Sequence, residues 1–116
     1  MNVILLICVQ LFLLTGYKTE KPILQLVSMA ESFIQDAEID LYCRAKHDSS
    51  LTFSWYLDDK ELKTDDDFSI LSISKKSSTL TIKNSNTRQS GKYSCKAIDE
   101  HGESNIAHLT INIEGC

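Results

Sequence analysis

Apolar and polar residues alternate along several short segments of this chain. In residues 38–45, for example, Ile39, Leu41, Cys43 and Ala45 alternate with polar or tyrosine positions. Successive side chains of a strand point to opposite faces, so this period of two predicts half-buried β-strands. The residues expected to face inward are Ile39, Leu41, Cys43, Ala45, Phe53, Trp55, Leu57, Leu80, Ile82, Tyr93, Cys95, Ala97, Ala107, Leu109, Ile111 and Ile113. The pattern predicts an all-β protein.

Polar, turn-forming segments separate these strands. Residues 46–50 predict a loop, residues 58–62 a hairpin turn, residues 84–90 a polar corner and residues 99–102 a tight connection with Gly102. Weaker strands are expected after Pro22, near residues 29–33 and over residues 69–74.

The first 16 residues differ from the rest. Residues 3–14 are apolar except for Gln10, and Thr15 and Gly16 supply small residues. This run is shorter than the roughly 20 residues that a membrane-spanning helix needs, and no second apolar run follows. We therefore expect residues 1–16 to be a secretory signal peptide rather than a buried N-terminal strand, and we expect no membrane span. Residues 17–116 would then be one domain in an oxidising compartment, without Cys8.

Composition excludes several classes of protein. The 116 residues suit a single domain, and 42% hydrophobic with 24% charged residues argues against disorder. A net charge of −4 offers no basic surface for nucleic acid, so we expect no nucleic-acid partner.

Four residues carry a more specific signal. Cys43 and Cys95 lie 52 positions apart, Trp55 follows the first cysteine by 12, and Tyr93 precedes the second by two. This pattern resembles the immunoglobulin superfamily, and further residues resemble its I-set (intermediate) branch. They are Leu80, Ile82, Gly91, Ala97, Gly102, Leu109 and Ile111.

The resemblance implies a Greek-key, antiparallel β-sandwich with its core in residues 22–113. It also implies a structural disulfide between Cys43 and Cys95, with Trp55 packed against it and Tyr93 fixing the corner before the second cysteine. A disulfide that closes a loop of this length would add about 2–4 kcal/mol to the free energy of unfolding. Leu80 and Leu109 would complete the core.

The chain departs from the I-set pattern at four positions. Gln89 stands where the family usually has an aspartate that pairs with a basic residue near strand D, and the segment entering that strand is acidic at residues 65–67. Ser85 replaces an apolar residue, and Asp36 and Asp59 replace turn glycines. We expect mild strain at the two aspartates and a less rigid corner over residues 85–89.

The sequence offers no catalytic, metal or cofactor site. It has no Gly-x-Ser-x-Gly elbow, no expected Cys–His pair and no phosphate-binding glycine loop, so we do not expect an enzyme. Six acidic residues lack the spacing of a calcium loop, and His47, His101 and His108 show no zinc spacing and are expected at the surface. The acidic residues are Asp58, Asp59, Glu61, Asp65, Asp66 and Asp67.

Strand parity instead predicts an exposed recognition surface. If Trp55, Cys95 and Leu109 point inward, their neighbours on strands C, F and G point outward. Apolar residues mixed with cations around an aromatic side chain are typical of a partner-binding patch, although scattered surface residues are the alternative. The outward residues are Tyr56, Ser94, Lys96, Ile98, Ile106 and His108. No Asn-x-Ser/Thr sequon occurs that would place a glycan on them.

Cys116 follows Gly115 and is the third cysteine of the mature domain, so once Cys43 and Cys95 pair it has no partner within that domain. It would form an interchain disulfide in a homodimer or mixed conjugate, or remain a free or capped thiol.

Function is expected to be binding rather than catalysis. The chain is similar to the small secreted one- and two-immunoglobulin proteins of invertebrates. That similarity implies an extracellular or cell-surface protein partner and a role in cell–cell recognition or adhesion, such as synapse organisation or axon maintenance. The alternatives are a soluble decoy or immune-recognition protein and an intracellular structural module of the muscle-scaffold type.

Overall fold

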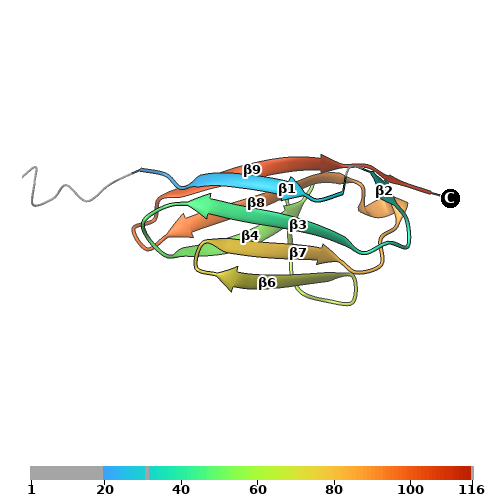
Figure 1. Ribbon diagram of the computed structural model, residues 1–116, viewed down its shortest axis with the longest axis horizontal. Helices are drawn as coiled ribbons and strands as arrows, with labels where there is room; N and C mark the ends of the chain where they lie inside the picture. The colour runs from blue at the N-terminus through green and yellow to red at the C-terminus, as the bar shows by residue number, and fades with distance from the viewer. Residues whose placement is uncertain (1–19, 31, 116) are drawn as a thin grey trace, which may run out of the picture.

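A computed structural model describes residues 20–30 and 32–115, and these residues fold into strands joined by short turns (Figure 1). The predicted signal peptide, Cys8 and Cys116 lie outside this described part. The elements are β1 (Ile23–Ser28), β2 (Phe33–Ile34), β3 (Ile39–Lys46), β4 (Leu51–Leu57), β5 (Lys60–Leu62), β6 (Phe68–Ser74), β7 (Ser77–Ile82), the 3₁₀ turn η1 (Thr87–Gln89), β8 (Gly91–Asp99), β9 (Ser104–Ile111) and β10 (Ile113–Glu114).

Two four-stranded antiparallel sheets pack face to face. One has the order β1-β3-β7-β6 and lies toward the viewer in Figure 1, while the other has the order β5-β4-β8-β9. The chain crosses between the sheets after β3, after β5 and after β7, which gives the Greek-key connectivity of an immunoglobulin sandwich. A short parallel pair, β2 with β10, closes one end. The predicted all-β sandwich is confirmed. Near residues 29–33, however, only the two-residue β2 forms.

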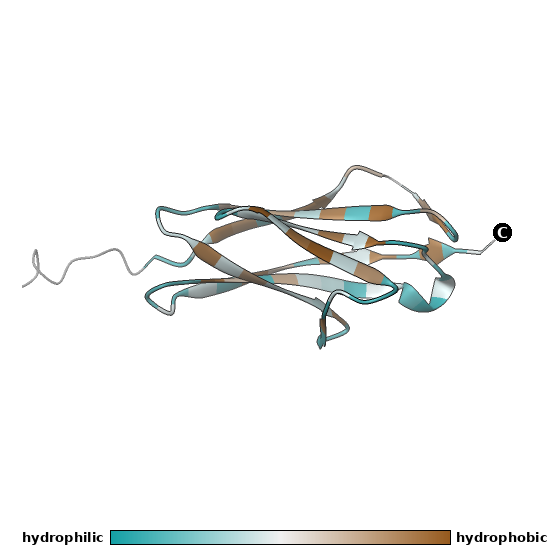
Figure 2. Ribbon diagram, turned by 90° about the horizontal axis from the view of Figure 1, so that it is seen from below, coloured by the Kyte–Doolittle hydropathy of each residue, from teal (hydrophilic) through white to brown (hydrophobic). Residues whose placement is uncertain are grey.

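The core is built around the bridge between the sheets. Cys43 on β3 and Cys95 on β8 form a disulfide with a Cα–Cα distance of 6.4 Å, as predicted. Trp55 is fully buried beside β8, and its indole Nε1–H donates a hydrogen bond of 3.0 Å to the hydroxyl of Ser78. Because Ser78 is also buried, this bond satisfies the one polar group that a tryptophan brings into a core. The apolar segments of the ribbon lie on the strands in Figure 2.

Most of the residues expected to face inward do so. Leu80 and Tyr93 are fully buried, whereas Leu109 is only half-buried and packs against the edge of the core together with Ala107, Phe53 and Leu57. The buried hydrophobic residues are Leu26, Ile39, Leu41, Cys43, Trp55, Phe68, Leu80, Ile82, Tyr93, Cys95, Ala97, Ile111 and Ile113.

The corner over residues 85–89, which was expected to be less rigid, contains several hydrogen bonds. Tyr93 donates its phenolic hydrogen to the carbonyl of Gln89 at 2.6 Å, while the Gln89 side chain accepts from the N–H of Asn86 at 3.0 Å. Buried Ser85 donates to the carbonyl of Ile34 at 3.2 Å. Hydrogen bonds therefore stand where the family has an ion pair and an apolar contact.

Aspartates form two turns that need left-handed backbone. Asp36 and Asp59 have φ of 70° and 68°, as the departures from the family pattern predict, and Asp58 joins them at 47°. Two successive positive φ values make residues 58–59 a two-residue hairpin of the kind that follows the twist of its strands. Opposite this turn, a Cβ on Gly91 would lie only 2.7 Å from a carboxylate oxygen of Asp58, so the close approach requires glycine.

Loss of the disulfide should destabilise the domain strongly. The Cys43→Ala/Cys95→Ala variant should lose about 2–5 kcal/mol of unfolding free energy, because the unfolded chain is no longer constrained. For a domain of this size that corresponds to a melting temperature lower by about 10 °C or more. Thermal melts followed by circular dichroism test this, and reductant should lower only the melting temperature of the parent chain. An equal melting temperature for parent and variant would contradict the role assigned to the bridge.

Candidate functional site

The outward residues of the β5-β4-β8-β9 sheet form an ordered array. Strand register places Tyr56, Ser94 and His108 in one cross-strand row, and Ser54, Lys96 and Ile106 in the next row with the same orientation. Ile98 lies in a third row, between Thr52 and Ser104. We call Tyr56, Lys96, Ile98, Ile106 and His108 the candidate face.

Two isoleucines form the apolar part of this face. Ile98 on β8 is 38% exposed and Ile106 on β9 is 43% exposed. Ile106 stands opposite Lys96, two residues before Ile98, so the isoleucines are diagonal neighbours on adjacent strands, within reach of one another. The structure thus brings together the residues that parity placed outward, with the Lys96 ammonium-bearing side chain beside the apolar pair.

Ser94 differs from expectation. Parity puts it on the outer face, yet it is fully buried. Tyr56 and His108 flank it on both sides, and its hydroxyl lies 2.7 Å from Nδ1 of His108. The hydrogen bond holds the His108 ring on the sheet beside Ser94.

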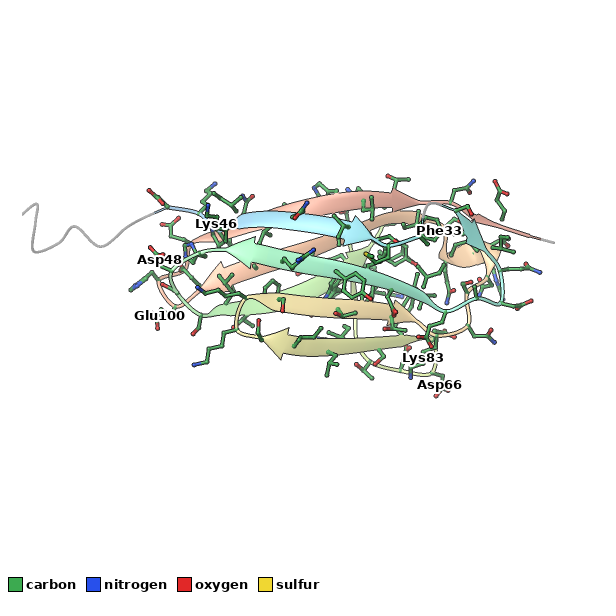
Figure 3. The ribbon with its side chains drawn as sticks, in the orientation of Figure 1. Phe33, Lys46, Asp48, Asp66, Lys83 and Glu100 are labelled. Carbon is green, nitrogen blue, oxygen red and sulfur yellow. A yellow bond between two sulfur atoms is a disulfide. The ribbon has the colours of Figure 1, made fainter. Side chains whose placement is uncertain are left out.

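A buried polar pair holds the loops at one end of this sheet, which corrects the expectation that His47 lies at the surface. Nε2 of His47 lies 2.8 Å from Oδ2 of Asp99, and these side chains are 10% and 1% exposed. The two residues are 52 positions apart; His47 directly follows β3, and Asp99 is the last residue of β8. Figure 3 shows their loops together, with Asp48 and Glu100 labelled at the same end of the molecule. Sequence periodicity holds no information on contacts between loops, so no signal in the chain predicted this pair.

Asp99 also orders the turn that connects the two strands carrying the isoleucines. Its Oδ1 accepts the backbone N–H groups of His101 and Glu103, each at 2.9 Å. Burial alone would raise the pKa of Asp99, but the hydrogen bonds from His47 and from these two amides outweigh it and lower the pKa below its usual value. The Asp99 carboxylate therefore stays ionised and fixes the ends of β8 and β9 next to Ile98.

The outer face of the opposite sheet carries apolar side chains that sequence reasoning did not single out. Leu71 and Ile73 on β6 are exposed, and Tyr42 on β3 and Met29 border the same face. Thr79 is buried between Tyr42 and Leu71 in register, and its Oγ1 has no hydrogen-bond partner within the described residues. The signal was present in the sequence, because Ile70 and Leu71 are apolar at successive positions, where a half-buried strand alternates.

Within residues 20–30 and 32–115, no three His, Cys, Asp or Glu side chains are close enough to hold a metal ion. The same residues contain no helix with the length and hydrophobicity to cross a bilayer.

Comparisons with known proteins agree with the fold. The family model described as Immunoglobulin I-set domain matches residues 25–113. No curated protein sequence matches the chain.

Solved immunoglobulin domains superpose well at low sequence identity. The Dscam1 Ig7 domain, isoform 5, aligns with a TM-score of 0.71 and 19% identity over 80% of this chain and 96% of that chain. The I67–I69 fragment of titin aligns with a TM-score of 0.71 and 14% sequence identity, over 83% of this chain and 33% of that chain. The kinase region of twitchin from C. elegans aligns with a TM-score of 0.70 and 20% sequence identity, over 81% of this chain and 16% of that chain. At these identities the similarity shows a shared fold.

The Asp99 carboxylate should contribute to stability in a pH-dependent way. Because its pKa is lowered in the folded state, its contribution is present above about pH 4, the range of an ordinary aspartate, and is lost as the pH falls through the lower folded value. The Asp99→Asn variant should melt below the parent at pH 7, and this difference should shrink as the pH falls below the range of an ordinary aspartate.

The melting temperatures of the parent and of Asp99→Asn, measured from pH 2 to pH 8, test this prediction. Glu38→Gln, at an exposed carboxylate, is the matched control and should follow the parent across the range. A difference between parent and Asp99→Asn that stays constant with pH would contradict the assignment.

Proposed function

This chain belongs to the immunoglobulin I-set family, and from that premise we propose that it is an extracellular, non-enzymatic module that binds a protein at cell surfaces. I-set domains are in general binding or structural modules. The fold alone does not select a partner, so the proposal depends on which surface of this particular chain is suited to binding.

The observation that carries the proposal is the candidate face. Its two exposed isoleucines are diagonal neighbours, Lys96 pairs with Ile106, and Tyr56 and His108 lie in the next cross-strand row. Interfaces commonly have an apolar centre with an aromatic anchor and a polar rim. Tyr56 is half-buried, so its ring is already held in place and loses little conformational freedom on binding. A partner with an apolar patch bordered by carboxylates suits this surface, because Lys96 supplies a cation beside Ile106.

An extracellular location rests on two features. The predicted signal peptide directs secretion, and a disulfide such as Cys43–Cys95 persists in oxidising compartments. Titin and twitchin, whose domains align with this chain, supply the rival interpretation of a muscle-scaffold module, which would not be secreted.

The more specific role is implied by the resemblance to small secreted immunoglobulin proteins. We propose cell–cell recognition or adhesion, such as synapse organisation or axon maintenance, with a soluble decoy or immune-recognition protein as the alternative. A covalent homodimer through Cys116 belongs to the same proposal and would be visible on non-reducing gels of the parent chain beside Cys116→Ser.

The candidate face can be tested by screening the secreted chain against an array of cell-surface receptor ectodomains. Any ectodomain bound by the parent should lose affinity by at least tenfold for Ile98→Asp, which corresponds to about 1.4 kcal/mol for a charge placed in the apolar centre. Tyr56→Ala should also weaken binding, because it removes the aromatic anchor.

Ile23→Asp is the matched control, since it places the same charge on an exposed isoleucine of the opposite sheet. It should bind like the parent, and circular dichroism should show that all three variants are folded. Full binding by both Ile98→Asp and Tyr56→Ala would reject this face.

A further inference from the structure

The β1-β3-β7-β6 sheet ends in a strand without charge. β6 pairs with β7, and no other strand of the described chain lies along its free edge (Figure 1). Its seven residues contain neither a charged side chain nor proline. Edge strands of natural proteins are usually protected from further association by such residues. β6 has instead a single irregularity between Ser72 and Ser74.

Apolar side chains extend from this edge onto the outer face of the sheet. Leu71 and Ile73 are 63% and 62% exposed, more than either isoleucine of the candidate face. Ile73 also borders a shallow groove of about 320 Å³ whose lining includes Met29 and Tyr42. We call Met29, Tyr42, Leu71 and Ile73 the β6 surface. Several exposed apolar residues side by side indicate a surface that another molecule covers.

The charges that flank β6 indicate what that molecule is. Asp66 and Asp67 precede the strand, and Lys75 and Lys76 follow it. Asp66 and Asp67 lie in the bend that enters β6, and Lys75 and Lys76 form the turn that leaves it, so the two ends of the strand have opposite charges. Figure 3 shows Asp66 beside the end of the sheet where β6 begins. The flanks of the strand are therefore complementary to the flanks of a second β6 that runs in the opposite direction.

We propose that a second copy of this chain docks on the β6 surface, with the two β6 strands antiparallel. With the two Leu71 residues opposite each other, Asp67 and Asp66 of each copy stand beside Lys75 and Lys76 of the other. A two-fold axis repeats each of these contacts, as is usual in homodimers. A parallel arrangement would place aspartates beside aspartates and lysines beside lysines, which repel.

Side chains rather than backbone pairing carry the contact at the acidic end. The N–H of Phe68 donates to Oδ1 of Asp65 at 2.9 Å, and the N–H of Ile70 donates to the hydroxyl of Thr64 at 3.1 Å. These bonds already occupy these two backbone N–H groups in the first half of β6, so the groups do not need to pair with another strand. Burial of Leu71 and Ile73 then supplies the affinity, and the flanking charges set the orientation.

Sedimentation velocity over a range of protein concentrations tests the proposal. All variants are made in a Cys116→Ser background, so that no interchain disulfide contributes. The parent should show a monomer–dimer equilibrium, and Leu71→Asp should raise the dimer dissociation constant by at least tenfold. Ile98→Asp should dimerise like the parent, because Ile98 lies on the other sheet, and so failure of the dimer is distinguishable from failure of the candidate face.

Exchange of the flanking charges tests the orientation. The variants Asp66→Lys/Asp67→Lys and Lys75→Asp/Lys76→Asp should each be monomeric alone, because each has like charges at both ends of β6. An equimolar mixture of the two should form a heterodimer with a dissociation constant near that of the parent dimer. A parent that is monomeric at every concentration, a dimer unaffected by Leu71→Asp, or a mixture that stays monomeric would each overturn the proposal.

Discussion

The bridge between Cys43 and Cys95, with Trp55 beside it, is the constraint on which the rest of the structure depends. It joins one strand of each sheet through the centre of the core, with 6.4 Å between the Cα atoms. Because side chains alternate along a strand, fixing these residues inward fixes which of their neighbours face solvent. A slip of one residue in β8 would bury Lys96 and expose Cys95. The bonds from Trp55 to Ser78 and from Tyr93 to Gln89 pair the buried indole N–H and the buried phenolic hydroxyl.

The alternation of apolar and polar residues and the spacing of the cysteines and tryptophan predicted which side chains face the core. The inward positions of β3, β4 and β8 follow from the alternation of side chains along a strand. The disulfide and the aspartates in left-handed turns were implied by the resemblance to the I-set pattern. Contacts between segments distant in sequence did not follow. The His47–Asp99 pair joins two loops whose approach is set by the packing of whole sheets, and the closed corner at Ser85 depends on the carbonyl of Ile34, 51 positions away. Ser94 was predicted to be exposed because alternation along the strand tells which way a side chain points. It does not tell whether neighbouring side chains cover it, and the residues that flank Ser94 bury it.

The two outer surfaces of the sandwich have different chemistry. The candidate face combines isoleucines with Lys96, Tyr56 and His108, whereas the β6 surface combines apolar side chains with a groove that Arg44 also lines, and β6 itself has no charged residue. Since the surfaces lie on opposite sheets, a molecule can engage a different protein through one while it pairs with its own kind through the other. A dimer of this type presents two candidate faces, which raises the effective affinity for a clustered cell-surface partner without any new contact.

The central claim is that this I-set domain works outside the cell, and mass spectrometry of the chain expressed in secreting animal cells tests it most directly. The account predicts that the protein is recovered from the medium with its N-terminus at Tyr17 and with the Cys43 and Cys95 peptides linked by a disulfide. Recovery only from the cytosol, with residues 1–16 attached and both cysteines reduced, would contradict it.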